Sequence, residues 1–185
     1  FYANTSNSIG GAVSLASSND EDYSASIINS IFWENSAAGV GNQIALNQKS
    51  ANSVLNLTIG FNVLQGGIPE IGLPEFANGS TGHSFNVTGT NLDVDPLFAF
   101  DNNLIVMPGS PAIDAGTNSP PGGLSATDYV GISRSLDGNN DGVNTADIGA
   151  FEFDPANRNN IGINSARFSA KAKINDSPPD SLALI

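Results

Sequence analysis

The chain has 185 residues, 18 of them acidic and 6 basic, which gives a formal net charge of −12. Such an acidic chain lacks the basic surface that a phosphate backbone requires, so we expect no nucleic acid partner, whereas an extracellular setting and cation binding suit it. It has no cysteine for disulfides or thiolate metal sites, and no apolar run of about 18 residues that could span a membrane.

The composition predicts short strands joined by turns. Charged residues make up only 13% of the chain, and Asn, Ser, Gly, Thr and Ala are prominent. Long amphipathic helices usually need more Glu, Lys, Leu and Arg than this. The chain opens on "FYANTSNSIGG", without a signal peptide, so we expect it to be a fragment of a longer protein.

Two pairs of similar segments occur in the first 67 residues. Ser26–Asn35 and Val54–Gly67 both alternate apolar and polar residues, as strands with one buried face do, and they superpose at an offset of 28. The side chains assigned to one face are Ile27, Asn29, Ile31 and Trp33 in the first segment and Leu55, Leu57, Ile59 and Phe61 in the second. A glycine-containing strand precedes each segment, at Gly10–Leu15 and Gly41–Leu46, with an offset of 31.

This repeat predicts the coils of a parallel β-helix, an all-β solenoid, over residues 1–67. One coil cannot bury its own inward side chains, so stacked coils share an apolar column, in which the amide of Asn29 needs a backbone or asparagine partner. A β-sandwich is the alternative, although hairpin signals are scarce. Because the end of a stack exposes unpaired backbone groups, we expect further residues or a partner chain to cover the first coil.

Regular alternation stops after residue 67. Pro69, Pro74 and scattered glycines interrupt the pattern and predict a long excursion that packs on the last coils. We assign residues 68–153 to this excursion and a C-terminal cap. Residues 154–185, which hold four of the six basic residues, are assigned to a tail or linker.

Four short motifs follow one another in the second half of the chain. They are Asp95-Pro96-Leu97-Phe98, the segment "PGSPAIDAG" from Pro108 to Gly116, Asp128 with Gly131 and Arg134, and "DIGAFE" from Asp147 to Glu152. Together they resemble the C-terminal region of bacterial surface proteins with parallel β-helix repeats, the choice-of-anchor Q domain family, in which Tyr is usual at the position of Phe151. The resemblance implies a right-handed β-helix with the pectate-lyase-like superfold, closed by a loop-rich cap, in a protein that is secreted or held at the cell surface. It implies little about activity, because this fold hosts lyases, hydrolases and adhesins.

Five charged residues are expected to hold the cap together. A cap has few strand ladders, so its buried carboxylates must bind backbone N–H groups or an arginine. The candidates are Asp114, Asp128, Arg134, Asp147 and Glu152. Arg134 is the one arginine before the tail, and we predict that it pairs with Asp147, Asp114 or Asp128 in a structural role.

The stretch "DGNNDG" begins like a calcium loop, with side-chain oxygens at Asp137, Asn139 and Asp141. A helical calcium loop also needs a carboxylate eleven positions after the first Asp, where this chain has Ile148, while Asp147 comes one residue early. Two interpretations stay open. One is a non-helical Ca²⁺ site, and the other is a turn whose side chains bind its own backbone, with Asp147 inward and the other three at the surface.

Two functions are carried forward. The clear motifs belong to the cap, which favours a structural or adhesive module of a cell-surface protein that binds a polysaccharide or another surface protein chain. The alternative is the C-terminal end of a secreted polysaccharide lyase or glycoside hydrolase whose active coils lie upstream. A lyase needs basic residues, and the coils hold only Lys49; a hydrolase needs two converging carboxylates, for which Asp20, Asp22 and Glu34 are candidates. The single histidine, His83, is interpreted as structural or solvated.

Overall fold

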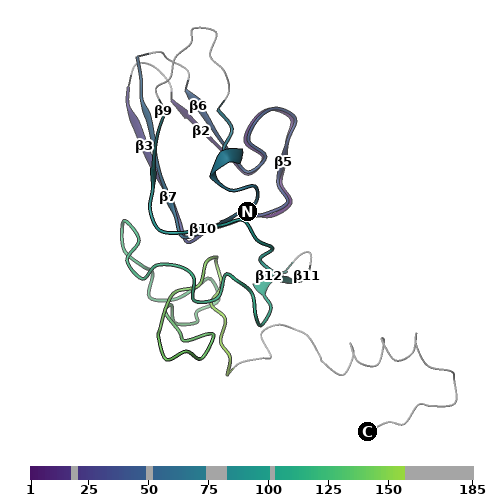
Figure 1. Cartoon of the computed structure of the whole chain (residues 1–185), viewed down its shortest axis with the longest axis vertical. Helices are drawn as coiled ribbons and strands as arrows, with labels where there is room; N and C mark the ends of the chain where they lie inside the picture. Colours follow the sequence, from purple (N-terminus) through teal and green to yellow (C-terminus); the bar gives the residue numbers. More distant parts are fainter. Residues whose placement is uncertain (18–20, 49–51, 74–82, 101–102, 157–185) are drawn as a thin grey trace, which may run out of the picture.

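The computed structural model describes residues 1–17, 21–48, 52–73, 83–100 and 103–156 (Figure 1). Regular structure within these ranges is all-β apart from one short 3-10 helix, η1 (Ile68–Glu70). The strands are β1 (Thr5–Ser6), β2 (Val13–Ser17), β3 (Tyr23–Ile28), β4 (Ile31–Phe32), β5 (Ser36–Ala37), β6 (Ile44–Gln48), β7 (Leu55–Gly60), β8 (Asn62–Leu64), β9 (His83–Val87), β10 (Asn91–Leu92), β11 (Phe98–Phe100) and β12 (Asn103–Val106). The predicted all-β class is confirmed.

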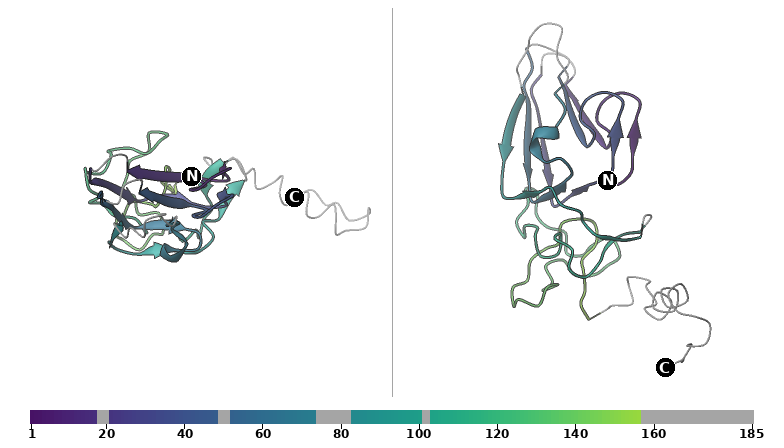
Figure 2. Two further views of the ribbon diagram at one scale, coloured as in Figure 1. Left: turned by 90° about the horizontal axis from the view of Figure 1, so that it is seen from above. Right: turned by 45° about the vertical axis from the view of Figure 1, so that its right-hand side comes forward.

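Strands of the first half pair in parallel with strands one repeat further along the chain. Val13 of β2 lies beside Ile44 of β6, so the offset of 31 residues predicted for these two strands is confirmed. Thr5 of β1 lies beside Ser36 of β5 at the same offset. Strands β1 to β4 form the first layer and β5 to β8 the second. In a third layer, β9 pairs with β7 and β10 pairs with β8, again in parallel. Figure 2 shows the strands lying in successive layers above the loops of the second half.

The longer strands are offset by 32 residues, and the predicted offset of 28 is wrong. β3 pairs with β7 so that Ile27 lies beside Ile59, and the backbone N–H of Ser30 bonds the side chain of Asn62, 32 residues on. The sequence alignment had matched Ile27 with Leu55. A strand alternates with a period of two residues, so registers that differ by an even number bury equally apolar faces and the pattern alone cannot separate them.

Residues with left-handed backbone recur at the same corners of successive layers. Asn29 (φ 51°) lies between β3 and β4, Phe61 (φ 54°) lies between β7 and β8, and Gly89 (φ 62°) lies between β9 and β10. A second column of left-handed residues consists of Ala3, Glu34 and Gly66. A single left-handed residue turns the chain sharply between two extended segments, so each layer bends at the same places.

The bend at Asn29 separates side chains that the sequence assigned to one face. Ile27 packs against the core between the strands, whereas Ile31 belongs to a second core on the other side of β4. The prediction of one continuous face over Ser26–Asn35 is therefore wrong, because the left-handed residue resets the direction of the alternation. Trp33 is half-buried at the edge of the second core.

Two apolar clusters organise the molecule. The first fills the space between the strands and consists of Phe32, Ile44, Leu46, Leu55, Leu57, Ile59, Leu64 and Ile71. The second lies between β4, β8 and the second half of the chain and consists of Ile31, Val63, Val106, Ala112, Ile148 and Phe153. Adjacent residues of the short strands enter different clusters, so β4 and β8 are covered on both sides.

The described residues from 93 to 156, here called the loop region, pack against the outer side of the sheet β4–β8–β10. In the first layer, Asn29 donates its side-chain amide to the carbonyl of Thr117 and accepts the Thr117 N–H, both at 2.9 Å, while Gly149 N–H donates to the Asn29 carbonyl at 3.0 Å. In the third layer, Leu92 packs on the same apolar cluster. This region therefore packs beside short strands of all three layers, through Ile31, Val63 and Leu92.

Parallel pairing continues past residue 67 to Leu92, because β9 and β10 form within the excursion and pair with β7 and β8. The antiparallel pair β11–β12 then opens the loop region. Of the tail assigned to residues 154–185, only 154–156 are described. No helix in the described ranges is long and apolar enough to cross a membrane.

Candidate functional site

Asp147 lies at the centre of the loop region and is 1% exposed. One carboxylate oxygen accepts the backbone N–H of Asp114 at 2.8 Å, and the other accepts the N–H of Phe153 at 2.5 Å. Asp147 therefore ties the "PGSPAIDAG" segment to the last described residues, and the prediction that its side chain points inward is confirmed.

Asp128 closes a neighbouring turn. One of its oxygens accepts the N–H groups of Val130 (2.9 Å) and Ile132 (2.8 Å), and the other accepts the N–H of Glu152 (3.0 Å). Because both oxygens already bind backbone donors, the main work of this carboxylate is to fix the loop that carries Tyr129.

Asp114 acts in the same way on the "DGNNDG" turn, where it accepts the N–H groups of Gly138 (3.2 Å) and Asn139 (2.7 Å). Gly138 is not among the residues with left-handed backbone. A Cβ there would lie 2.7 Å from the Ile113 side chain, so a close approach is what requires glycine at this position.

Arg134 pairs with Glu152, at 3.0 Å between Nη1 and Oε1. Its two terminal nitrogens also donate to the carbonyl of Gly149, at 3.0 and 3.1 Å. The predicted pairing with Asp147, Asp114 or Asp128 is wrong, because the loop backbone already occupies the oxygens of those three carboxylates. Glu152 instead brings a buried charge, 1% exposed at its side chain, that needs the guanidinium.

The Glu152 carboxylate is only partly satisfied. Its Oε1 also accepts the N–H of Asp147 at 3.1 Å, but its Oε2 is buried and makes no hydrogen bond of acceptable geometry with the described residues. Burial raises the pKa of Glu152, while the charge of Arg134 and the N–H groups of Asp147 and Leu136 lower it.

Burial also raises the pKa of Asp147, from 3.8 to about 7. The hydrogen bonds from Asp114 and Phe153 oppose this rise, and the negative charges of Glu152 and Asp114 add to it. Desolvation has the largest effect on the pKa because a carboxylate with so little exposure has lost nearly all of its hydration. Asp147 therefore titrates near neutral pH.

The "DGNNDG" turn is held by its own side chains. Asp137 accepts the N–H groups of Asp141 (2.9 Å) and Gly142 (2.8 Å), Asn139 accepts the Asp141 N–H (2.8 Å), and Asp141 accepts the Val143 N–H (2.8 Å). These bonds confirm the predicted compact turn bound to its own backbone, in which Asn139 and Asp141 are exposed and Asp137 is half-buried.

The predicted Ca²⁺ site at this turn gains no further ligand from the structure. The described residues include no group of three or more His, Cys, Asp or Glu side chains placed to hold a metal ion. Calcium binding by Asp137, Asn139 and Asp141 stays a prediction.

A groove of about 390 Å³ opens between β3 and the loop region. The lining residues are Ser26, Ile28, Asn29, Pro120, Pro121, Gly123, Leu124, Ser125, Thr127, Asp128, Tyr129, Arg134 and Ala150. Sequence reasoning found Asp128 and Arg134 but missed the groove, since Ser26 and Thr127 lie about a hundred residues apart in the sequence. The one local signal for the groove in the sequence was the aromatic residue Tyr129, directly after the turn-forming Asp128.

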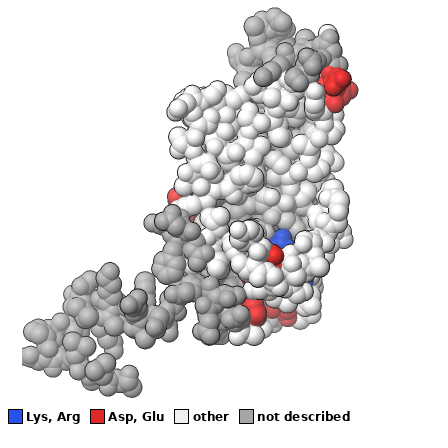
Figure 3. Space-filling view, turned by 180° about the vertical axis from the view of Figure 1, so that it is seen from behind, with Lys and Arg blue, Asp and Glu red and all other residues white. Residues whose placement is uncertain are grey.

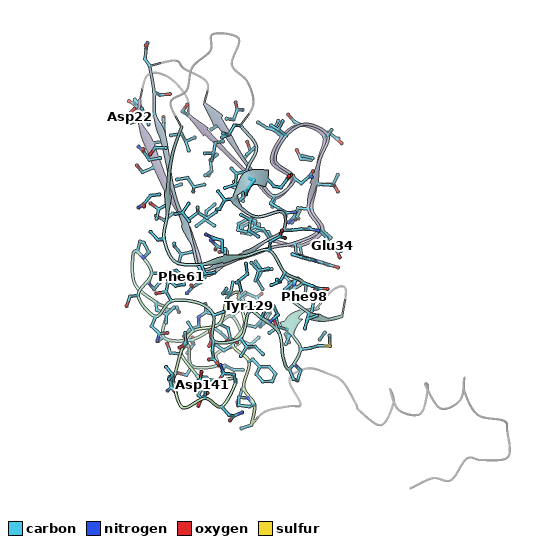
Figure 4. The ribbon with its side chains drawn as sticks, in the orientation of Figure 1. Asp22, Glu34, Phe61, Phe98, Tyr129 and Asp141 are labelled. Carbon is cyan, nitrogen blue, oxygen red and sulfur yellow. The ribbon has the colours of Figure 1, made fainter. Side chains whose placement is uncertain are left out.

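Tyr129 stands at the edge of this groove and is 82% exposed. Its position is fixed nevertheless, because its N–H donates to the Ala150 carbonyl at 3.0 Å and its ring meets the edge of the Phe151 ring, with centroids 5.7 Å apart. Figure 4 labels Tyr129 in the loop region, just below the strand layers.

The other candidate residues do not gather. Asp22 lies beside the start of β3, where it accepts the Val54 N–H at 2.7 Å, and Glu34 lies at the bend after β4, on the other side of the molecule (Figure 4). These two carboxylates do not converge as a hydrolase pair must. Asp20, Lys49 and the side chain of His83 lie outside the described residues.

Comparison with protein-family models, with curated proteins and with solved structures gives no match for this chain.

Proposed function

We propose that this chain is part of a right-handed parallel β-helix in an extracellular, cell-surface protein of the choice-of-anchor Q kind, with a structural and adhesive role. The observation that carries the proposal is the layer-by-layer parallel pairing, in which strands of three successive layers lie side by side. Left-handed residues at the same corners of each layer support the same path for every turn of the chain.

The loop region serves this role as a lateral brace. The short strands present Ile31, Val63 and Leu92 on their outer side, one from each layer. Left uncovered, this row would be an exposed apolar patch. The loop region buries this row. Asn29 of the first layer also binds the backbone of Thr117 in the loop region, and together these contacts oppose sliding of the layers past one another.

The surface of the strand layers supports an adhesive role. Seen from behind, it carries few charged atoms, apart from acidic residues at one upper corner and charges near its base (Figure 3). A surface with few charged side chains suits contact with a large uncharged partner better than capture of a small charged substrate.

Two measurements test the proposal. Antibodies raised against the chain should label intact producing cells, while antibodies against a cytosolic protein should not; labelling only after permeabilisation would refute the surface role. An experimental structure should show right-handed coils, and antiparallel Greek-key sheets would refute the fold.

A further inference from the structure

The outer face of the sheet β3–β7–β9 carries two rows of small polar side chains. The register places Ser24, Asn56 and Ser84 in one row and Ser26, Thr58 and Asn86 in the other. The burial pattern of β3 and β7 points the alternate residues inward, so these six point outward. None of the six side chains hydrogen-bonds another residue in the described part of the chain, and none carries a charge.

These rows lead into the groove beside the loop region. Ser26 belongs to the second row and also lines the groove, whose far side is formed by Pro121, Thr127 and Tyr129. A strip of free hydroxyl and amide groups thus ends at an exposed aromatic ring. Neighbouring strands are about 4.8 Å apart, so the polar groups along a row recur at a spacing close to the length of one sugar unit.

The charges near the groove are already engaged. Asp128 binds three backbone N–H groups, and Arg134 is paired with Glu152. Counting Asp128, Arg134 and Glu152 as ionised leaves one net negative charge, on a chain whose formal net charge is −12. An anionic ligand would be repelled here, whereas a neutral one would meet no electrostatic penalty.

We propose that this groove and the adjoining rows bind a neutral polysaccharide, with the ring of Tyr129 stacked on the face of one sugar. Sugar hydroxyls both donate and accept hydrogen bonds, as the Ser, Thr and Asn side chains of the rows do. The Tyr129 backbone N–H is bound to the Ala150 carbonyl and its ring contacts the Phe151 ring, so binding orders little additional structure. The inference rests on the proposed adhesive role and names its ligand class.

The test measures binding of the whole chain to neutral polysaccharides (xylan, mannan, amylose and mixed-linkage β-glucan) and to acidic ones (alginate and polygalacturonate) by affinity electrophoresis, followed by calorimetry. We expect at least one neutral polysaccharide to bind and the acidic ones not to bind. Tyr129→Ala should weaken binding roughly tenfold, and Tyr129→Phe should retain it.

Matched variants make the test specific. Val130→Ala removes another exposed apolar side chain of the same turn that does not line the groove, and should bind like the parent. Ser26→Glu should abolish binding, while Ser14→Glu, on the exposed side of β2, should not.

The proposal is overturned if no neutral polysaccharide binds, if acidic ones bind better, or if Tyr129→Ala binds as tightly as the parent. Each variant's thermal midpoint is measured in parallel. A failure of binding with unchanged midpoints rejects the groove alone and leaves the proposed surface role to its own tests.

Discussion

The strand layers and the loop region are stabilised by different physical means. In the layers, backbone ladders pair neighbouring strands and apolar side chains fill the interior, so that Leu57 and Ile59 are 1% and 0% exposed. In the loop region, ladders are scarce and carboxylates take their place, with Asp114, Asp128 and Asp147 each binding at least two backbone N–H groups. The stability of the strand layers should therefore depend on the volume of buried apolar side chains. The stability of the loop region should depend on its buried charged groups and on pH.

The largest effect is expected where the loop region buries a charge. Arg134→Met leaves Glu152 without its partner and should lower the free energy of unfolding by about 3–5 kcal/mol, measured by urea denaturation. The double variant Arg134→Met/Glu152→Gln should recover much of this loss. A single variant as stable as the parent would show that the ion pair does not hold the loop region.

The layers should respond to a cavity instead. Leu57→Ala, in the middle layer, should lower the free energy of unfolding by about 2–5 kcal/mol. The matched change Leu15→Ala, at a half-buried residue of the first layer, should have a smaller effect. Equal effects at both positions would argue that burial does not increase from the first layer to the second.

The loop region should also make stability depend on pH. The folded-state pKa of Asp147 is raised from 3.8 to about 7, so this group's contribution is fully present below pH 3.8 and is lost as pH rises through 7. The free energy of unfolding should therefore fall by roughly 2–3 kcal/mol between pH 5 and pH 8.

Asp147→Asn provides the control for this pH dependence. The variant should be less stable at both pH values, because its amide NH₂ faces a backbone donor, and it should lose most of the pH slope. A parent protein that becomes more stable between pH 5 and pH 8 would contradict the raised pKa.

The smallest effect is expected at the "DGNNDG" turn. Asp141→Ala removes one exposed acceptor, for the Val143 N–H, and should cost about 1 kcal/mol or less. Calorimetry with and without Ca²⁺ decides between the two interpretations of the turn, and an unchanged thermal midpoint of the parent would leave the turn bound to its own backbone. A midpoint that rises with Ca²⁺, and no longer does so in Asp141→Ala, would establish the metal site instead.

The sequence predicted features that depend on local spacing and missed those that depend on long-range contact. Alternation identified the longer strands β3 and β7, and Asx and glycine residues identified the "DGNNDG" turn, because both signals extend over a few residues. The register of β3 on β7 failed because alternation is ambiguous by even shifts. The prediction that Ile31 shares a face with Ile27 was wrong because the residue type of Asn29 does not by itself require a left-handed backbone.

The candidate site shows the same limit. The sequence motifs predicted that five charged residues of the second half act together, but they did not determine which of these residues pair. The five are Asp114, Asp128, Arg134, Asp147 and Glu152. The partner of Arg134 depends on which carboxylates the backbone already occupies, and that is known only once the loop is folded. The groove was missed for a related reason, since it joins β3 to a loop about a hundred residues away.

The contact between Asn29 and Thr117 also sets an order of folding. These residues are 88 apart in the chain, whereas Thr5 and Ser36 of neighbouring layers are 31 apart. Closing the longer loop costs about 1 kcal/mol more in chain entropy, and contacts between distant residues form more slowly. During synthesis, Ile31 and Val63 therefore stay bare until the ribosome has released the segment that covers them. Pulsed hydrogen exchange should show strand amides protected before that of Thr117, and the reverse order would contradict this sequence of events.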